Sequence, residues 1–149
     1  MMIVLDIVTA VCIGLLIGTE FAVSVFINPI LRKLDDRAQA HAIRLFARRL
    51  GGAMPFWYAT SLLLLIAEAI IRRHESGHLL LFTAGVIWIA VILHTVLVLV
   101  PINNRMTRLD SNSFPPEAQR DHRKWDRLHR LRVVALVAAM VCFFVAIRI

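Results

Sequence analysis

Four long apolar stretches, separated by polar and mostly basic segments, make up most of this chain. They cover about residues 3–27, 53–71, 79–100 and 131–149. A run of about 20 mainly apolar residues is long enough to cross the hydrocarbon core of a bilayer as an α-helix. The pattern therefore predicts an all-α protein, in which residues 1–149 form a single integral membrane domain built as a four-helix bundle.

The polar segments predict where these helices end. Residues 32–50 combine six Lys and Arg residues with a rough helical periodicity of apolar positions, which is typical of an amphipathic helix at the lipid headgroups. We expect Gly51-Gly52 to end that helix. Asn28-Pro29 is expected to end the first span and Pro101-Ile102-Asn103 to form a turn after the third, because a proline disfavours helix at the residue before it.

The composition supports a membrane location. Hydrophobic residues make up 59% of the chain, and its mean hydropathy is +0.73, whereas a soluble domain is apolar in about half of its residues. The formal net charge is +7, but the basic residues lie between the apolar stretches rather than on one face of a folded module. This distribution argues against nucleic acid as a partner. Cys12 and Cys142 lie inside apolar stretches and are expected to be small core residues.

The distribution of Lys and Arg predicts the orientation in the membrane. The first polar connection carries six of them and the third carries eight, against two in the second and one in the C-terminal tail. Because basic connections stay on the cytoplasmic side, the first and third connections are expected in the cytoplasm and both termini outside. We expect a multi-pass protein of the inner, or plasma, membrane, with the lipid bilayer as its main partner.

Three polar side chains lie inside the apolar stretches at a similar depth. Glu20, Tyr58 and His94 each lie about 6 Å from the middle of their span toward the basic side, at about 1.5 Å per residue. Glu20 should face the bundle interior, because a charge in hydrocarbon costs on the order of 3 kcal/mol. Glu68 lies near the far end of its span and is expected to reach headgroups or water.

The last basic segment adds a second group of polar residues. Trp125, His129 and Arg132 share one helical face, because the spacing i, i+4, i+7 matches 3.6 residues per turn. Asn28 and Asn103 lie at the same end of the predicted bundle. We expect one pocket, open to its cytoplasmic half, to collect the following side chains: Glu20, Asn28, Tyr58, His94, Asn103, Trp125, His129 and Arg132.

These residues also have structural explanations. Polar groups inside a membrane serve as hydrogen-bond partners between helices. His129 and Arg132 could contact lipid headgroups, and Trp125 could belong to the interfacial aromatic belt. Two histidines and a carboxylate could hold a metal, but the chain has no His-Glu-x-x-His motif. We therefore assign no metal ligand, and the sequence leaves any cofactor unknown.

The chain resembles a known family. The glycine-rich first stretch ending in Asn28-Pro29, the Pro101-Ile102-Asn103 segment and the Trp125, His129 and Arg132 spacing are similar to those of anthrone-oxygenase-like proteins. These are small four-helix membrane proteins, many of unknown function, and the resemblance covers nearly the whole chain. It implies the oxidation of an anthrone-type aromatic ketone to a quinone by molecular oxygen.

Our first functional hypothesis is accordingly an oxygenase that acts on an aromatic or polycyclic ketone. A histidine can act as a general base near neutral pH, so an acidic C–H next to the carbonyl would lose its proton to His94 or His129. Glu20 would orient His94. Arg132 and Asn103 would hold the enolate and Trp125 would stack on the ring. The expected substrate-binding residues are Asn28, Tyr58, Asn103, Trp125 and Arg132.

Two other hypotheses stay open at this point. The protein could be a non-catalytic membrane protein, either a structural subunit or a small-molecule binder. It could also be a redox carrier that holds haem or a metal through His94 and His129. The sequence leaves the oligomeric state open as well.

Overall fold

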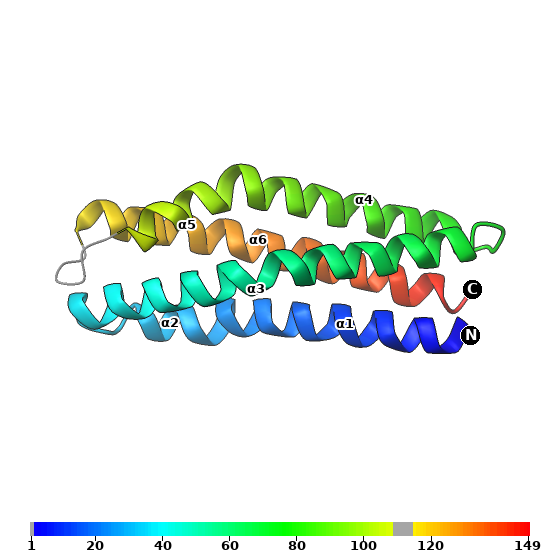
Figure 1. Ribbon diagram of the computed structural model, residues 1–149, viewed down its shortest axis with the longest axis horizontal. Coiled ribbons are helices and arrows are strands. Elements are labelled where there is room, and N and C mark those ends of the chain that lie inside the picture. The colour runs from blue at the N-terminus through cyan, green and yellow to red at the C-terminus, as the bar shows by residue number, and fades with distance from the viewer. Residues whose placement is uncertain (1, 109–114) are drawn as a thin grey trace.

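The chain is almost entirely helical in its computed structural model, which describes residues 2–108 and 115–149. The described residues form four long helical rods, which lie side by side (Figure 1). Two of the elements, η1 and η2, are π-helical turns within a rod. In chain order the elements are α1 (Met2–Ala22), η1 (Val23–Ile27), α2 (Asn28–Leu31), α3 (Asp36–Ile71), α4 (His78–His94), η2 (Thr95–Leu99), α5 (Val100–Thr107) and α6 (Pro116–Ala146).

The four rods confirm the predicted all-α membrane bundle. They cover Met2–Leu31, Asp36–Ile71, His78–Thr107 and Pro116–Ala146, and each is long and apolar enough to cross a membrane. Each long helix packs against two others, since α1 contacts α3 and α6, and α4 contacts the same two helices. The start of α1, the α3–α4 link and the end of α6 lie at one end of the bundle (Figure 1). This up-and-down arrangement is that of a four-helix bundle.

The prediction of a separate helix over residues 32–50 is wrong. Helix α3 begins at Asp36, where the Asp35 carboxylate accepts a hydrogen bond from the Ala38 N–H at 3.0 Å, and it continues through Gly51-Gly52 to Ile71. A glycine weakens a helix by only about 1 kcal/mol, which tertiary packing overrides here. The 36 residues of α3 extend for about 54 Å, well beyond a hydrocarbon core of about 30 Å. That the basic part of α3 lies in the cytoplasm remains a prediction.

The prolines do not end helices as the sequence predicted. The first rod continues past Pro29 to Leu31, and the third continues past Pro101 to Thr107. A π-helical turn precedes each proline: the Asn28 N–H bonds to the Val23 carbonyl, and the Val100 N–H bonds to the Thr95 carbonyl. Proline lacks an N–H and its ring crowds the preceding turn of an α-helix. The wider π turn accommodates it, so both rods change pitch instead of stopping.

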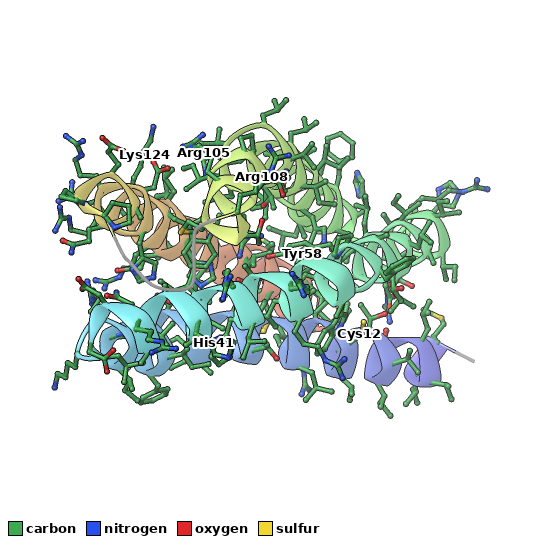
Figure 2. The ribbon with its side chains drawn as sticks, turned by 60° about the vertical axis from the view of Figure 1, so that its left-hand side comes forward. Cys12, His41, Tyr58, Arg105, Arg108 and Lys124 are labelled. Atoms are coloured by element: carbon green, nitrogen blue, oxygen red, sulfur yellow. The ribbon has the colours of Figure 1, made fainter. Side chains whose placement is uncertain are left out.

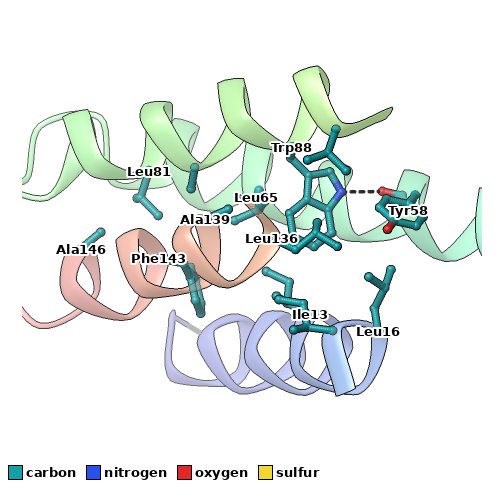
Figure 3. Packing of buried hydrophobic residues seen from close by; sticks show 13 residues of the cluster. Ile13, Leu16, Tyr58, Leu65, Leu81, Trp88, Leu136, Ala139, Phe143 and Ala146 are labelled. Carbon is teal, nitrogen blue, oxygen red and sulfur yellow. Dashed lines mark hydrogen bonds between the residues drawn. The ribbon is translucent and has the colours of Figure 1, made fainter. Parts of the chain in front are cut away.

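The hydrophobic core has two parts. The larger part lies toward the end where α1 begins and includes Leu16, Leu81, Trp88 and Phe143, none of which is measurably exposed (Figure 3). The Trp88 indole N–H donates to the Tyr58 carbonyl at 3.1 Å, which ties α4 to α3. A smaller cluster closes the basic end and consists of Leu31, Ala40, Ile43, Ile102, Met106 and Ala118. Residues from both parts line the cavity described below.

A buried polar network ties α1 to α3 at the end of the bundle where α1 begins. Glu68 is only 1% exposed, so the expectation that it reaches headgroups or water is wrong. Its carboxylate accepts hydrogen bonds from the Thr9 hydroxyl at 3.2 Å and from Arg72 Nε at 3.3 Å. Arg72 also donates to Glu75 at 2.6 Å and to both Asp6 oxygens at 2.7 and 3.0 Å. Burial alone would lower the pKa of Arg72, but its carboxylate partners hold that pKa above its ordinary value.

Candidate functional site

A mostly apolar cavity of about 270 Å³ lies in the half of the bundle that carries the basic segments. All four rods contribute to its wall. Its size is near the lower end of ligand pockets, which are typically about 300–1,000 Å³. A few polar residues interrupt the apolar lining: Glu20, Asn28, Tyr58, Thr95, Asn103, His122, Trp125, His129 and Arg132. An apolar space with a few convergent polar groups is the usual form of a small-molecule site.

A buried ion pair between Glu20 and Arg132 forms the polar wall of this cavity. Arg132 Nη2 donates to Glu20 Oε2 at 2.5 Å, and the Tyr58 hydroxyl donates to Oε1 at 3.0 Å. Glu20 is 3% exposed and Arg132 is 8% exposed. The guanidinium carbon lies 5.7 Å from the centre of the Tyr58 ring. A buried ion pair is tolerated only when its remaining polar atoms are also satisfied, and Tyr58 does this for the carboxylate. In Figure 2, Tyr58 is labelled near the middle of the molecule, and Arg105, Arg108 and Lys124 are labelled on the side of α5 and α6.

The hydrogen bonds of His129 fix its protonation state. Arg132 Nη2 lies 2.8 Å from His129 Nδ1, and because arginine can only donate, Nδ1 is the acceptor and carries no proton. Nε2 therefore carries the proton and donates to the Glu20 carbonyl at 3.0 Å. Nδ1 also lies 3.2 Å from Glu20 Oε2, and the Arg132 donor between these two acceptors relieves their repulsion. His129 is thus a neutral imidazole with both ring nitrogens in use.

One nitrogen of the Arg132 side chain is available to donate to a ligand. Its Nη1 donates to the Thr95 hydroxyl at 3.2 Å, and its Nη2 serves Glu20 and His129. Its Nε is buried and has no hydrogen-bond partner among the residues that the structure describes. An unpaired buried N–H is unfavourable by about 1–3 kcal/mol. A ligand oxygen that accepts this hydrogen bond would recover that energy.

The aromatic and amide side chains complete the wall. Trp125 stacks on His129, with ring centres 4.6 Å apart and planes inclined by 12°. The Asn28 amide donates to Asp126 at 2.9 Å, which joins α2 to α6, and Asp126 also pairs with Arg130 at 2.9 Å. The Asn103 amide nitrogen would lie 3.6 Å from a Cβ atom at Gly51, so α3 and α5 approach closely there.

Seven of the eight residues expected in one pocket line the cavity: Glu20, Asn28, Tyr58, Asn103, Trp125, His129 and Arg132. His94 does not. Its Nε2 is buried without a partner among the described residues, and the partners of the Glu20 carboxylate are Arg132 and Tyr58. The prediction that Glu20 orients His94 is therefore wrong. His94 has the expected depth, but its neighbour Thr95 faces the cavity, and adjacent residues on a helix point about 100° apart.

Two lining residues went unnoticed in the sequence. His122 is buried in the wall and lies seven residues before His129, so the face shared by Trp125, His129 and Arg132 extends back to it. Continuing the same spacing by one turn before Trp125 would have found it. Thr95 is one of two threonines in its apolar stretch and gave no such signal. Among the described residues, no group of three or more His, Cys, Asp or Glu side chains could hold a metal ion.

The family model for anthrone oxygenase matches residues 43–142. The chain belongs to the anthrone oxygenase family. The matched region runs from within α3 to near the end of α6 and includes Tyr58, Asn103, Trp125, His129 and Arg132, whereas Glu20 and Asn28 lie before it. Family membership makes the protein oxygenase-like. No curated protein and no solved structure matches the chain.

Proposed function

We propose that this protein is a membrane-embedded oxygenase that oxidises a planar, lipophilic aromatic ketone of the anthrone type in the cavity. The observation that carries the proposal is the buried Arg132 guanidinium, which presents an unpaired Nε–H at the wall of an apolar space. A preorganised donor in a dry site stabilises an oxyanion far better than water does. The Asn103 amide also lines the cavity, eight residues along its rod from Thr95, so it can contact a second polar group at the other end of a planar ligand.

His129 is the proposed base. If the Arg132 guanidinium turns toward the ligand oxygen, it releases His129 Nδ1, which can then accept a proton from the acidic carbon of the ketone. The resulting imidazolium would lie beside Glu20 Oε2, 3.2 Å away, which stabilises its charge. Tyr58 holds that carboxylate in place, and Trp125 holds the imidazole plane. We assign no step to His94, because it does not line the cavity.

The reaction with oxygen follows from the enolate. The enolate transfers one electron to O₂, and the two radicals combine to form a C–O bond. The resulting peroxide anion takes up the proton held by His129, which gives a hydroperoxide. The same carbon then loses its second hydrogen as a proton while the O–O bond breaks and hydroxide leaves. Hydroxide takes up a proton to give water. One oxygen atom thus becomes the new carbonyl of the quinone, and the other becomes water.

Oxygen uptake by the purified protein in lipid nanodiscs tests this function. With 1,8-dihydroxyanthrone, the parent should consume one O₂ for each quinone formed, at a rate well above the spontaneous reaction. His129→Ala should lower the rate by about 10²–10⁴-fold, the usual contribution of a general base. Thr9→Val, which removes a neutral member of the other buried network, serves as the matched control. Parent-like turnover by His129→Ala would exclude His129 as the base.

A second candidate function uses the same cavity without chemistry. Both ring nitrogens of His129 already have partners, so the observed arrangement also suits a protein that only binds a lipophilic aromatic molecule. Such a binder would take up 1,8-dihydroxyanthraquinone and would not accelerate oxygen consumption by the anthrone. The redox-carrier alternative has less support, because His94 and His129 do not face one site.

We further propose that the basic end of the bundle faces the cytoplasm and both termini face outward. The support is the excess of Lys and Arg in the first and third connections. In a background of Cys12→Ser and Cys142→Ala, Ser76→Cys should react with a membrane-impermeant maleimide added to intact cells, because Ser76 is exposed in the α3–α4 link. Lys33→Cys should react only after the cells are opened. The opposite pattern would reverse the orientation.

A further inference from the structure

The exposed part of the cavity wall lies on two facing segments. The lining residues that are exposed all belong to α3 or to η2 and α5, and all six are apolar: Phe46, Gly51, Pro55, Ala59, Val96 and Val100. The other lining residues are buried or half-buried. The cavity therefore borders the exterior between α3 and the η2–α5 segment, and we name this border the lateral opening.

Three of the four residues on the α3 side of the lateral opening have small side chains. Gly51, Pro55 and Ala59 are spaced by four residues and so follow one another along one face of the helix. Val96 and Val100 have the same spacing on the opposite side. A larger side chain on either side would project across the gap.

The basic end of the cavity is closed, in contrast. The buried cluster that contains Leu31 of α2 and Ile102 and Met106 of α5 packs across this end. The hydrogen bond from Asn28 to Asp126 joins α2 to α6 at the same level, and both side chains are buried. Water and water-soluble molecules thus meet packed protein at this end.

The lateral opening lies where a lipid-soluble aromatic molecule would be found. Four of its six residues fall inside the predicted spans, close to their basic ends, and the other two come just before the second span. Amphipathic aromatic rings concentrate at this boundary between hydrocarbon and headgroups. The path from the opening leads over apolar side chains to the unpaired Nε of Arg132.

We infer that the ligand reaches the cavity sideways from the bilayer, through the lateral opening between α3 and the η2–α5 segment, with its rings along the apolar sides and its oxygen toward Arg132. The inference rests on the proposed function for the class of ligand, a planar aromatic ketone. The route itself is a property of the bundle, and it can be tested without any turnover.

The rate at which a cysteine inside the cavity is labelled tests the route by which molecules enter it. Thr95→Cys, in the background without Cys12 and Cys142, places a thiol on the cavity wall. Proteoliposomes are treated with N-(1-pyrenyl)maleimide, which is polycyclic and dissolves in the bilayer, or with the water-soluble anion sulfonatoethyl methanethiosulfonate. Each rate is divided by the rate of the same reagent on protein unfolded in dodecyl sulfate. The normalised pyrenyl rate should exceed the sulfonate rate by about tenfold, the ratio expected for a barrier difference of about 1.4 kcal/mol.

Neighbouring residues provide matched controls. Val96→Trp projects into the lateral opening, whereas Leu97→Trp adds the same side chain at an exposed position that does not line the cavity. Ala59→Trp and Thr60→Trp form the corresponding pair on α3. Val96→Trp and Ala59→Trp should each slow pyrenyl labelling by about tenfold, and the two controls should not change it.

The outcomes are distinct. Slower labelling in either opening variant but not in its control supports the lateral route, even if one of the two variants fails to fold. Equal rates within both pairs, or sulfonate labelling as fast as pyrenyl labelling, overturns it. Because labelling does not require oxygen or an anthrone, failure of the proposed function would appear only in the oxygen-uptake experiment.

Discussion

Two buried networks in this bundle have nearly the same chemistry but different surroundings. Each combines an arginine, a glutamate that is almost fully buried and a hydroxyl group from another helix. Around Arg72, every guanidinium nitrogen donates to a carboxylate, and none of that network lines the cavity. Around Arg132, one nitrogen has no partner among residues 2–108 and 115–149, and the network forms part of the cavity wall.

The comparison shows that burial of charge does not by itself indicate a functional site. A closed network satisfies its own donors and acceptors, and its contribution is to join helices. An open network beside an apolar cavity leaves a donor that a ligand can satisfy. We therefore propose that the Arg72 network only joins helices and that the Arg132 network binds the ligand. The following predictions test this difference.

The largest expected difference is in turnover. Arg132→Met should lower the rate of quinone formation by about 10²–10³-fold, because it removes the principal oxyanion donor. Arg72→Met should leave the rate per folded molecule within about twofold of the parent. Neither Arg72 nor its carboxylate partners line the cavity, and effects at separate sites are usually independent. The measurement is the initial rate at saturating 1,8-dihydroxyanthrone, corrected for folded protein. Similar losses in both variants would remove the functional distinction between the networks.

The next effect is on stability, where loss of the glutamate should cost the Arg132 network more. Glu20→Leu leaves the buried Arg132 without its carboxylate partner, which should lower the free energy of unfolding by about 3–5 kcal/mol. Glu68→Leu should lower it less, because Arg72 keeps its bonds to Asp6 and Glu75. Glu20→Gln and Glu68→Gln should lower it less, because the amide keeps a hydrogen-bond acceptor. Unfolding by dodecyl sulfate in mixed micelles measures this free energy. If Glu20→Gln were as damaging as Glu20→Leu, the hydrogen bonds of Glu20 would not be its structural contribution.

The smallest effect concerns packing at the two ends. A Cβ atom at Gly77 would collide with the backbone carbonyl of Ala146, so Gly77→Ala should destabilise the protein by about 1–3 kcal/mol. A Cβ atom at Gly52, near the cavity, would meet nothing within 4 Å. Gly52→Ala should therefore stabilise the protein by about 0.5–1 kcal/mol through helix propensity. Thermal unfolding of both variants in the same detergent gives the sign, and a stabilising Gly77→Ala would contradict the tight packing of that end.

The sequence predicted the four long apolar helices and the shared level of Glu20 and Tyr58, because both depend on simple repeats. The span of a bilayer sets the length of each apolar stretch, and a constant rise per residue sets the predicted depth of Glu20, Tyr58 and His94. Glu20 and Tyr58 do meet in a hydrogen bond, whereas His94 does not line the cavity. Most of the polar residues that line the cavity could therefore be predicted from their position and spacing in the sequence.

The direction in which a side chain points could not be predicted as well. His94 and Thr95 have almost the same depth, and only the packing of α4 against its neighbours decides which of them faces the cavity. Glu68 looked interfacial by position, but its partners Asp6 and Thr9 come from another helix, which the sequence of α3 does not reveal. The two π turns also escaped the pattern, because a proline in sequence indicates a change in the backbone without saying whether the helix stops or widens.

Those two π turns affect how relatives of this chain should be aligned. A π turn takes up one additional residue without ending the helix. A helical wheel drawn at 100° per residue from α1 to Asn28, or from α4 to Asn103, is therefore out of phase by about one residue, roughly 100°, beyond the turn. A relative that lacks this residue would differ from the present chain by a single gap inside an apolar stretch. If an alignment placed that gap away from the π turn, the cavity-facing asparagines would be aligned with residues on the lipid face.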